Sequence, residues 1–475
     1  MDPKRKRVLK WLAWLGGAAL VILAGMTAPK LVRDWLFYPS APVANFPPPA
    51  DATQARVQDL DYLEHYVRGY DRSYSTQARG EALDLIAHYR DEAAHMDASD
   101  FELAVARVVA LARNGHSSVW SHSRARRHPA LPVYGYAFDD GFYIVGAAPG
   151  YERLLGARLD TIGETPMADI IAAFRVYYGG RDEGYLEYTM TFLVQNTDFL
   201  HALGFLDDPT HAPLTVRLAN GTEETIVADA LPADPDRKTA WGADWLLPGV
   251  DTGAGRRMLD ANAELPLYLQ QGRLPFQMQP LPELNGLYVQ FRQNYDADGH
   301  PIADFVREVR AAVQELKPQV LVVDERMNGG GDYTTTADLM FDLPGMLPAG
   351  ARIYAIIGHG TFSAGISSVG FLKQAAGERL VLVGRRMGDS AMSWGETNDF
   401  VLPNSGIGIT AARGLHDQIH GCYDRLTCYW EDFNWPTAVG PMDPDEAVPF
   451  LFEDYAAGRD AAMARIRELE KTRGA

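Results

Sequence analysis

The sequence predicts an α/β protein built around a mostly parallel sheet. After residue 286, short apolar runs alternate with helical patterns, which is typical of a parallel sheet with helices on both faces. One run, 320–324, is continuously apolar, as expected of a strand buried on both sides. Before residue 280 the pattern is different: a helical stretch comes first, and short β-like runs separated by turns follow it.

The N-terminus predicts a membrane anchor. Four basic residues, 4–7, precede an uncharged run from Trp11 to Pro29, close to the ~20 residues that span a bilayer. A basic flank of this kind keeps the N-terminus in the cytoplasm and exports the remainder. A cleaved signal peptide is the alternative, but Met26 is bulky for a cleavage site before Ala28. We therefore expect an uncleaved signal anchor, with the remaining chain in the periplasm or outside the cell.

Composition bounds the possible partners. The 475 residues are 47% hydrophobic and 22% charged, as in globular proteins, and the formal net charge is −18. Nucleic acid is not expected as a partner, because its binding needs clustered Lys and Arg.

The elements follow in order along the chain. Residues 31–51 are Pro-rich and predict an extended linker. Residues 53–113 have a helical pattern that ends at Asn114-Gly115, directly before His116. Short β-like runs occupy 131–231, and 233–280 read as a connector. The regular α/β region then has predicted strands at 287–291, 320–324, 352–358 and 380–384, with helices at 302–316 and 366–376.

Ser363 is the candidate nucleophile. It lies in Thr361-Phe-Ser-Ala-Gly365, between a predicted strand and a predicted helix. Unpaired N–H groups and the positive end of the helix dipole surround such a position. They can stabilise the oxyanion that forms when a serine attacks a carbonyl. The alternative is an N-cap serine without chemistry.

A glycine-rich loop, Asn328-Gly-Gly-Gly-Asp332, follows the strand that ends at Asp324. Open α/β sheets bind ligands at this end of their strands, and glycines let the backbone approach a substrate closely. The Gly-Lys-Ser/Thr of a phosphate loop and the spacing of a dinucleotide fingerprint are both missing. A tight turn without chemistry remains the alternative.

A nucleophilic serine needs a base. Lys373 would lie about 15 Å along the helix from Ser363, too far for a hydrogen bond. Histidine remains, and spacing alone does not choose among the candidates, which are His116, His122, His128, His359, His416 and His420.

The two cysteines, Cys422 and Cys428, lie close together in the sequence. In an exported protein such a pair predicts a disulfide. A metal site that also uses His416 and His420 is the weaker alternative, since it needs more ligands. We expect no metal and no organic cofactor.

Several motifs together resemble the tail-specific serine peptidases, a family that includes carboxy-terminal-processing proteases, the tricorn core and retinoid-binding relatives. The resemblance covers roughly residues 52–465. Its motifs are Asn114-Gly-His116-Ser, Gly156–Pro166, Val322–Gly331, Thr361–Ala364, Val383-Gly384, Leu402–Ser405, Gly440–Asp445 and Ala457–Asp460.

The resemblance implies a crotonase/ClpP-like catalytic domain and a degenerate PDZ-like module. The implied divisions are an anchor with its basic flank at 1–30, a linker at 31–51, a helical domain at 52–125, the PDZ-like module at 130–232, a connector at 233–280 and the catalytic domain at 281–465.

The resemblance also implies roles for residues. Ser363 becomes the nucleophile, and the N–H groups of Ala364 and of Gly329 or Gly330 form the oxyanion hole. Members with a Ser–Lys dyad carry a lysine where this chain has 386–390, which contain none. The chain is therefore similar to the tricorn and retinoid-binding branch, whose base is a histidine, and this implies His116.

Two departures bear on activity. Gly115 stands where the tricorn arrangement has a serine, and Thr437 where it has a glutamate; Glu431 or Asp432 could replace that glutamate.

We expect a membrane-anchored serine endopeptidase that acts on peptides or proteins. The alternatives are an inactive binding protein on the same scaffold and a hydrolase of small esters or amides.

Overall fold

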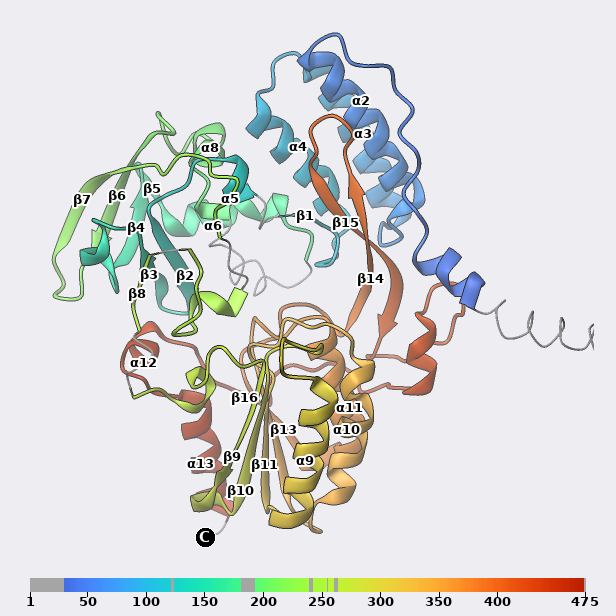
Figure 1. Ribbon diagram of the computed structural model, residues 1–475, viewed down its shortest axis with the longest axis vertical. Helices are drawn as coiled ribbons and strands as arrows, with labels where there is room; N and C mark the ends of the chain where they lie inside the picture. The colour runs from blue at the N-terminus through green and yellow to red at the C-terminus, as the bar shows by residue number, and fades with distance from the viewer. Residues whose placement is uncertain are drawn as a thin grey trace, which may run out of the picture.

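The computed structural model describes residues 30–120, 124–180, 193–238, 242–253, 255–259 and 264–473. It has a helical group, an antiparallel β module and a six-stranded sheet flanked by helices (Figure 1). The predicted mixed α/β class is confirmed. The finer expectations, a PDZ-like module and a crotonase/ClpP-like domain, go beyond what this topology establishes.

The six-stranded sheet carries the candidate site. Its strand order is β16-β13-β12-β11-β10-β9, and every neighbouring pair is parallel except the antiparallel pair β10–β9. The predicted strands coincide with observed ones, and β9 adds an edge strand from the end of the expected connector. The bounds are β9 Phe276–Leu281, β10 Gly286–Phe291, β11 Val320–Asp324, β12 Arg352–Ile357, β13 Leu380–Gly384 and β16 Glu446–Ala447.

Helices cover both faces of this sheet, as its apolar strands require. On one face lie α9 (Ile302–Leu316), α10 (Thr334–Met346) and α11 (Ala364–Ala376), which share one buried cluster with β10, β11 and β12. On the other face α13 (Ala461–Arg473) packs through Met463 and Ile466. The loops after β11 and β12 therefore emerge together at the carboxyl end of the sheet.

A long hairpin leaves the sheet region and reaches the helical group (Figure 1). It consists of β14 (Met392–Val401) and β15 (Gly408–Asp417), and β1 (Ser118–Val119) pairs with β15. Phe400 and Ile409 are buried in the same cluster as Leu60 and Val105 of the helices. The hairpin, whose residues fall within the expected catalytic domain at 281–465, thus completes the core of the helical group. The helices are α2 Ala52–His65, α3 Thr76–Glu92 and α4 Ala98–Ala110.

The β module is an antiparallel sheet with the order β2-β3-β4-β6-β7. A buried histidine, His128, ties it to α4, because its ring contacts Glu102 at 3.3 Å and Asp198 at 3.1 Å. The bounds are β2 Val133–Phe138, β3 Gly141–Ala147, β4 Arg158–Ile162, β5 Thr165–Pro166, β6 His211–Arg217, β7 Glu223–Asp229, β8 Arg256–Arg257, α5 Arg124–Arg127, α6 Met167–Phe174 and α8 Thr197–Ala202.

The prediction of a membrane-anchored protein is wrong, as judged by the length and apolar character of the described helices. In the part of the chain that the structure describes, no helix is both long and apolar enough to cross a bilayer. The predicted span, Trp11–Pro29, lies outside the described residues. The expected linker begins with a helix at 30–37, and Phe37 is fully buried against Tyr429 and Trp430.

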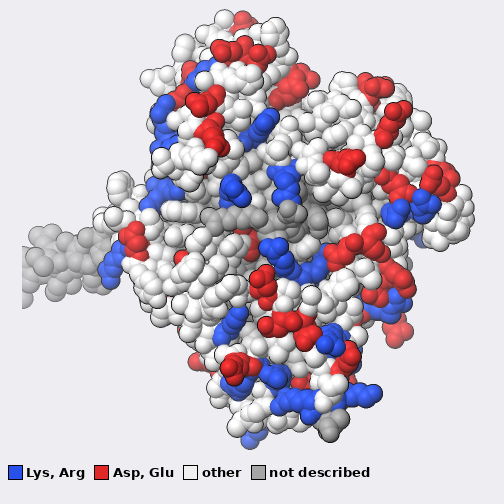
Figure 2. Space-filling model, turned by 180° about the vertical axis from the view of Figure 1, so that it is seen from behind, with Lys and Arg blue, Asp and Glu red and all other residues white. Residues whose placement is uncertain are grey.

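Charges of both signs lie close together on the face that Figure 2 shows. Figure 2 shows Lys and Arg interspersed with Asp and Glu across one whole face. The described residues on this face form no continuous basic stripe of the kind that follows a nucleic acid backbone.

Candidate active site

Ser363 occupies a strained position between β12 and α11. Its backbone has φ 53° and ψ −123°, in the left-handed half of φ/ψ space, which non-glycine residues rarely adopt. Strain of this kind is typical of functional sites. Although Ser363 is the N-cap residue of α11, its side chain makes no cap hydrogen bond. This geometry argues against the simple cap interpretation.

Gly330 brings the glycine loop directly against Ser363. Its φ is 106°, and a Cβ added there would lie 2.5 Å from the Cβ of Ser363 and 3.1 Å from the nitrogen of Ala364. Only glycine fits at this point. The loop after β11 and the loop after β12 therefore lie directly against each other at this point.

The N–H groups beside Ser363 differ in whether they already have an acceptor. The N–H of Gly329 donates to the carbonyl of Arg292 at 3.3 Å, and the N–H of Gly330 donates to Oδ1 of Asn328 at 2.9 Å. Within the described residues, the N–H groups of Gly331 and Ala364 have no acceptor. Both line the cavity in front of Ser363.

A cavity of about 260 Å³ opens at Ser363. It is lined by residues from the N-terminal segment, the glycine loop, α11 and the β14–β15 hairpin. They are Tyr38, His116, Gly331, Tyr333, Ser363, Ala364, Ile366, Ser367, Ser390, Ala391, Ser393, Gly395, Glu396, Thr397, His416 and Gln418.

His116 lies in this cavity, on the turn after α4. Its ring stacks on Phe362 with the ring centroids 4.5 Å apart, and its carbonyl accepts a hydrogen bond from Oγ1 of Thr410 at 2.7 Å. Burial, with a smaller effect of the nearby His416 charge, lowers the pKa of His116 to about 3. Its Nδ1 is buried without a partner. Burial thus keeps the imidazole of His116 neutral at neutral pH.

His416 also faces the cavity, but its imidazole ring is positively charged, whereas that of His116 is neutral. Its Nδ1 lies 3.1 Å from Asp432, and its Nε2 lies 3.4 Å from Glu396. Burial alone lowers the pKa of His416, but the two carboxylates outweigh it and raise this pKa to about 10. Because both ring nitrogens face carboxylates, His416 is a fixed cation and a poor base.

The carboxylates around His416 are held by two tyrosines. The hydroxyl of Tyr333 donates to Asp432 at 2.6 Å, and the hydroxyl of Tyr38 donates to Glu396. Glu396 has φ 54° and, together with Ser363, is one of the few non-glycine residues with positive φ. Sequence reasoning missed Glu396, because a strained residue inside a strand leaves no signal in the pattern. Glu431, the other suggested carboxylate, pairs with Arg33 instead.

The remaining histidine candidates lie elsewhere. His359 lines a separate small cavity, and His420 is exposed beside Asp417. His128 contacts two carboxylates in the β module, and His122 lies outside the described residues.

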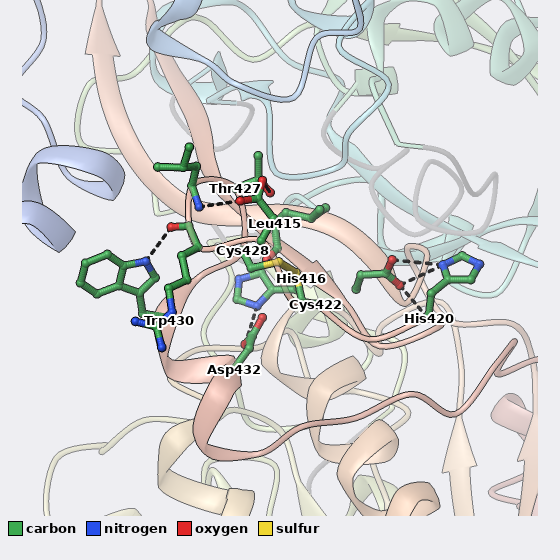
Figure 3. Close-up of a disulfide and its surroundings, with 12 residues drawn as sticks. Leu415, His416, His420, Cys422, Thr427, Cys428, Trp430 and Asp432 are labelled. Carbon is green, nitrogen blue, oxygen red and sulfur yellow. Dashed lines mark hydrogen bonds and ion pairs between the residues drawn. A yellow bond between two sulfur atoms is a disulfide. The ribbon is translucent and has the colours of Figure 1, made fainter.

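A disulfide joins Cys422 and Cys428 beside this cluster (Figure 3). The loop that it closes packs on β15, where the N–H of Leu415 donates to Thr427 and the N–H of Tyr429 donates to Leu415. His416 and Asp432 point toward each other directly below the disulfide (Figure 3). The bridge therefore helps to hold the segment that carries Asp432 against β15.

The stability of the protein is expected to fall as the pH rises from about 7 to about 10. The folded-state pKa of His416, about 10, exceeds the ordinary value of about 6.5 for histidine in an unfolded chain. Between these values the folded state binds more protons, so the free energy of unfolding decreases by up to about 1.4 kcal/mol per pH unit. Urea denaturation across this window measures the slope. His416→Gln should flatten it, and an unchanged slope would speak against the cation.

Comparison with known proteins bears on the fold. No family model matches the chain, and no curated protein matches it significantly. Among solved structures, mature CPAF is 14% identical with a TM-score of 0.57, and the match covers 88% of this chain and 97% of CPAF. CPAF complexed with lactacystin gives 13% identity, coverage of 89% and 98%, and a TM-score of 0.57. The chain has the fold of CPAF.

A more distant match is the photosystem II D1 C-terminal processing protease, at 14% identity and a TM-score of 0.36, with 87% of this chain and 99% of that one covered. The CPAF-like fold spans nearly the whole described chain, so the helical group, the β module and the sheet belong to one architecture.

Proposed function

We propose that the protein is a serine endopeptidase of the tail-specific type, with Ser363 as nucleophile and His116 as base. The observation that carries the proposal is one cavity lined by a strained, uncapped serine, a neutral histidine and two residues whose backbone N–H groups have no acceptor among the described residues. The CPAF-like fold supports it. So does the absence of any lysine from 386–390, which favours the histidine-dependent branch of the resembled family.

The geometry supports acyl transfer in two steps. Oγ of Ser363 attacks the substrate carbonyl carbon while His116 takes the hydroxyl proton. The resulting oxyanion faces the N–H groups of Gly331 and Ala364 and the positive end of the α11 dipole. When the C–N bond breaks, His116 gives its proton to the leaving amine. Water then attacks the ester in the same way and releases Ser363.

The expected substrate is a peptide or protein segment. The β module has an exposed edge at β7, on which an extended peptide could add as a further strand. No metal or organic cofactor enters this mechanism.

An inactive binding protein on the same scaffold is the second candidate. The specific observation in its favour is the buried Nδ1 of His116, which has no partner among the described residues. A catalytic histidine usually has an acceptor at this atom that fixes its tautomer.

Fluorophosphonate labelling followed by peptide mass spectrometry separates the two candidates. We expect a single adduct on Ser363 in the wild type, and a labelling rate reduced about 100-fold or more in His116→Ala, because general-base help is lost. Ser367 is an internal control, since it lines the same cavity. No adduct favours the binding protein, and an adduct on Ser367 refutes the assignment of Ser363.

Lactacystin offers a second probe, because CPAF has been solved in complex with it. If this chain shares that binding property, preincubation with lactacystin should protect Ser363 from the fluorophosphonate.

A further inference from the structure

Asn328 lies at the centre of a buried polar network behind the glycine loop. The residue is completely buried, and its side chain makes three hydrogen bonds. Oδ1 accepts the N–H of Gly330 at 2.9 Å. Nδ2 donates to Oδ1 of Asn294 at 2.7 Å and to Oε2 of Glu325 at 2.5 Å. An amide has both donors and an acceptor, so asparagine can make all three bonds at once.

The network reaches both helices that flank the site. Nδ2 of Asn294 donates to Oγ1 of Thr336 in α10 at 2.7 Å and to Oγ of Ser368 in α11 at 3.2 Å. The two hydroxyls are 3.0 Å apart. All of these residues are buried, so each bond is made in a low-dielectric interior where an unpaired group is costly.

The backbone of Asn294 also forms hydrogen bonds with the residues on either side of Gly331. Its N–H donates to the carbonyl of Gly330 at 2.8 Å, and its carbonyl accepts the N–H of Asp332 at 3.0 Å. The residues on both sides of Gly331 are therefore fixed. The orientation of the Gly331 N–H follows from them.

The backbone of Asn328 contacts the nucleophile turn. Its carbonyl accepts the N–H of Phe362, the residue before Ser363, at 2.9 Å. A Cβ added at Gly365 would lie 2.6 Å from the same carbonyl oxygen, so this turn packs tightly on Asn328. One residue thus holds the glycine loop through its side chain and the Ser363 turn through its backbone.

Glu325 is the partner of the second amide hydrogen of Asn328, and it is itself buried. Burial raises the pKa of its carboxyl well above the ordinary range. The contact fixes the amide of Asn328 from the side opposite to Gly330.

We propose that Asn328 is the positioning residue of the oxyanion hole. By accepting the N–H of Gly330, it removes that donor from the cavity and leaves the N–H of Gly331 to act together with that of Ala364. The inference rests on the proposed serine peptidase function, and it assigns Asn328 an effect on the transition state rather than on substrate binding.

The kinetic test compares three variants. Asn328→Ala removes the acceptor of Gly330 and should lower kcat and the rate of phosphonylation of Ser363 about 100-fold, with KM changed less than about threefold. Asn328→Asp keeps the acceptor of Gly330 but turns an oxygen onto Oδ1 of Asn294 and Oε2 of Glu325, so it should be less stable than the wild type and still react faster than Asn328→Ala. Thr336→Val is the matched control: it removes a hydroxyl from the same network without touching Gly330, and kcat should stay near the wild-type value.

The outcomes separate the two proposals. If the wild type reacts and Asn328→Ala reacts equally fast, the positioning role is refuted while the peptidase assignment stands. If Thr336→Val loses as much kcat as Asn328→Ala, the effect is general loosening of the network, and the positioning role is again refuted. If the wild type does not react at all, both proposals fall.

A measurement on the wild type covers the case in which Asn328→Ala does not fold. Residue-resolved hydrogen exchange should show strong protection of the Gly330 amide and exchange near the intrinsic rate for the Gly331 amide. Protection of Gly331 with fast exchange of Gly330 would overturn the inference.

Discussion

Replacing Ser363 by alanine is expected to lower kcat by about four to six orders of magnitude, because the group that forms the covalent intermediate is lost. The fold should be unaffected, since the Ser363 side chain makes no cap hydrogen bond. Hydrolysis of an unfolded protein substrate, followed by fluorescence or gel electrophoresis, measures the rate. Circular dichroism of the same samples checks the fold.

Ser367→Ala is the matched control for this experiment. Ser367 lines the same cavity and lies one helical turn further along α11. Its replacement should leave kcat within about threefold of the wild type, as for a residue without a role in the chemistry. If Ser363→Ala keeps wild-type activity, the nucleophile assignment fails, whichever residue then proves to be catalytic.

Replacing Gly330 by alanine is expected to reduce kcat about 100-fold or more. The added methyl would meet the Cβ of Ser363 at 2.5 Å, so either the glycine loop or the serine turn must move. Such a shift displaces the N–H groups of Gly331 and Ala364, and the loss of a single oxyanion donor costs about 10²- to 10³-fold in kcat. Steady-state kinetics and the phosphonylation rate should fall together.

Gly350→Ala distinguishes this steric effect from backbone strain. Gly350 also has a positive φ, 83°, but an added Cβ there meets nothing within 4 Å. Both alanines therefore adopt an unfavourable backbone conformation, at a cost of about 1–2 kcal/mol in stability. Only Gly330→Ala should lose catalysis. Equal losses in the two variants would show that the contact with Ser363 is unimportant.

The sequence predicted the central sheet closely. Strands at 320–324 and 380–384 and the helix at 302–316 occur with the expected bounds. These elements are buried on one or both faces, so their apolar residues follow a clear pattern: a continuous run in a strand buried on both faces, and helical spacing in a helix buried on one face. The glycine loop and Ser363 could also be placed in the fold from local pattern, because each follows a predicted strand of the same sheet, and their roles stay a prediction.

Other parts of the site left no local signal. The β14–β15 hairpin reaches the helical group, where Trp394 of β14 is hydrogen-bonded to Asn114, 280 residues away in sequence. The cation at His416 depends on Glu396 and Asp432, which come from different segments. The predicted oxyanion donors Gly329 and Gly330 already have acceptors, the carbonyl of Arg292 and the side chain of Asn328, and the first of these comes from another segment of the chain.

The sequence alone therefore determined the α/β class, the order of the sheet elements and the serine between a strand and a helix. These depend on the local periodicity of burial and on backbone chemistry within a few residues. The tertiary structure alone decided the rest. It brought His116 and His416 into the cavity of Ser363, gave the two histidines opposite charge states and left the N–H of Gly331 without an acceptor among the described residues. Those properties depend on distances between remote segments and on the burial that packing creates.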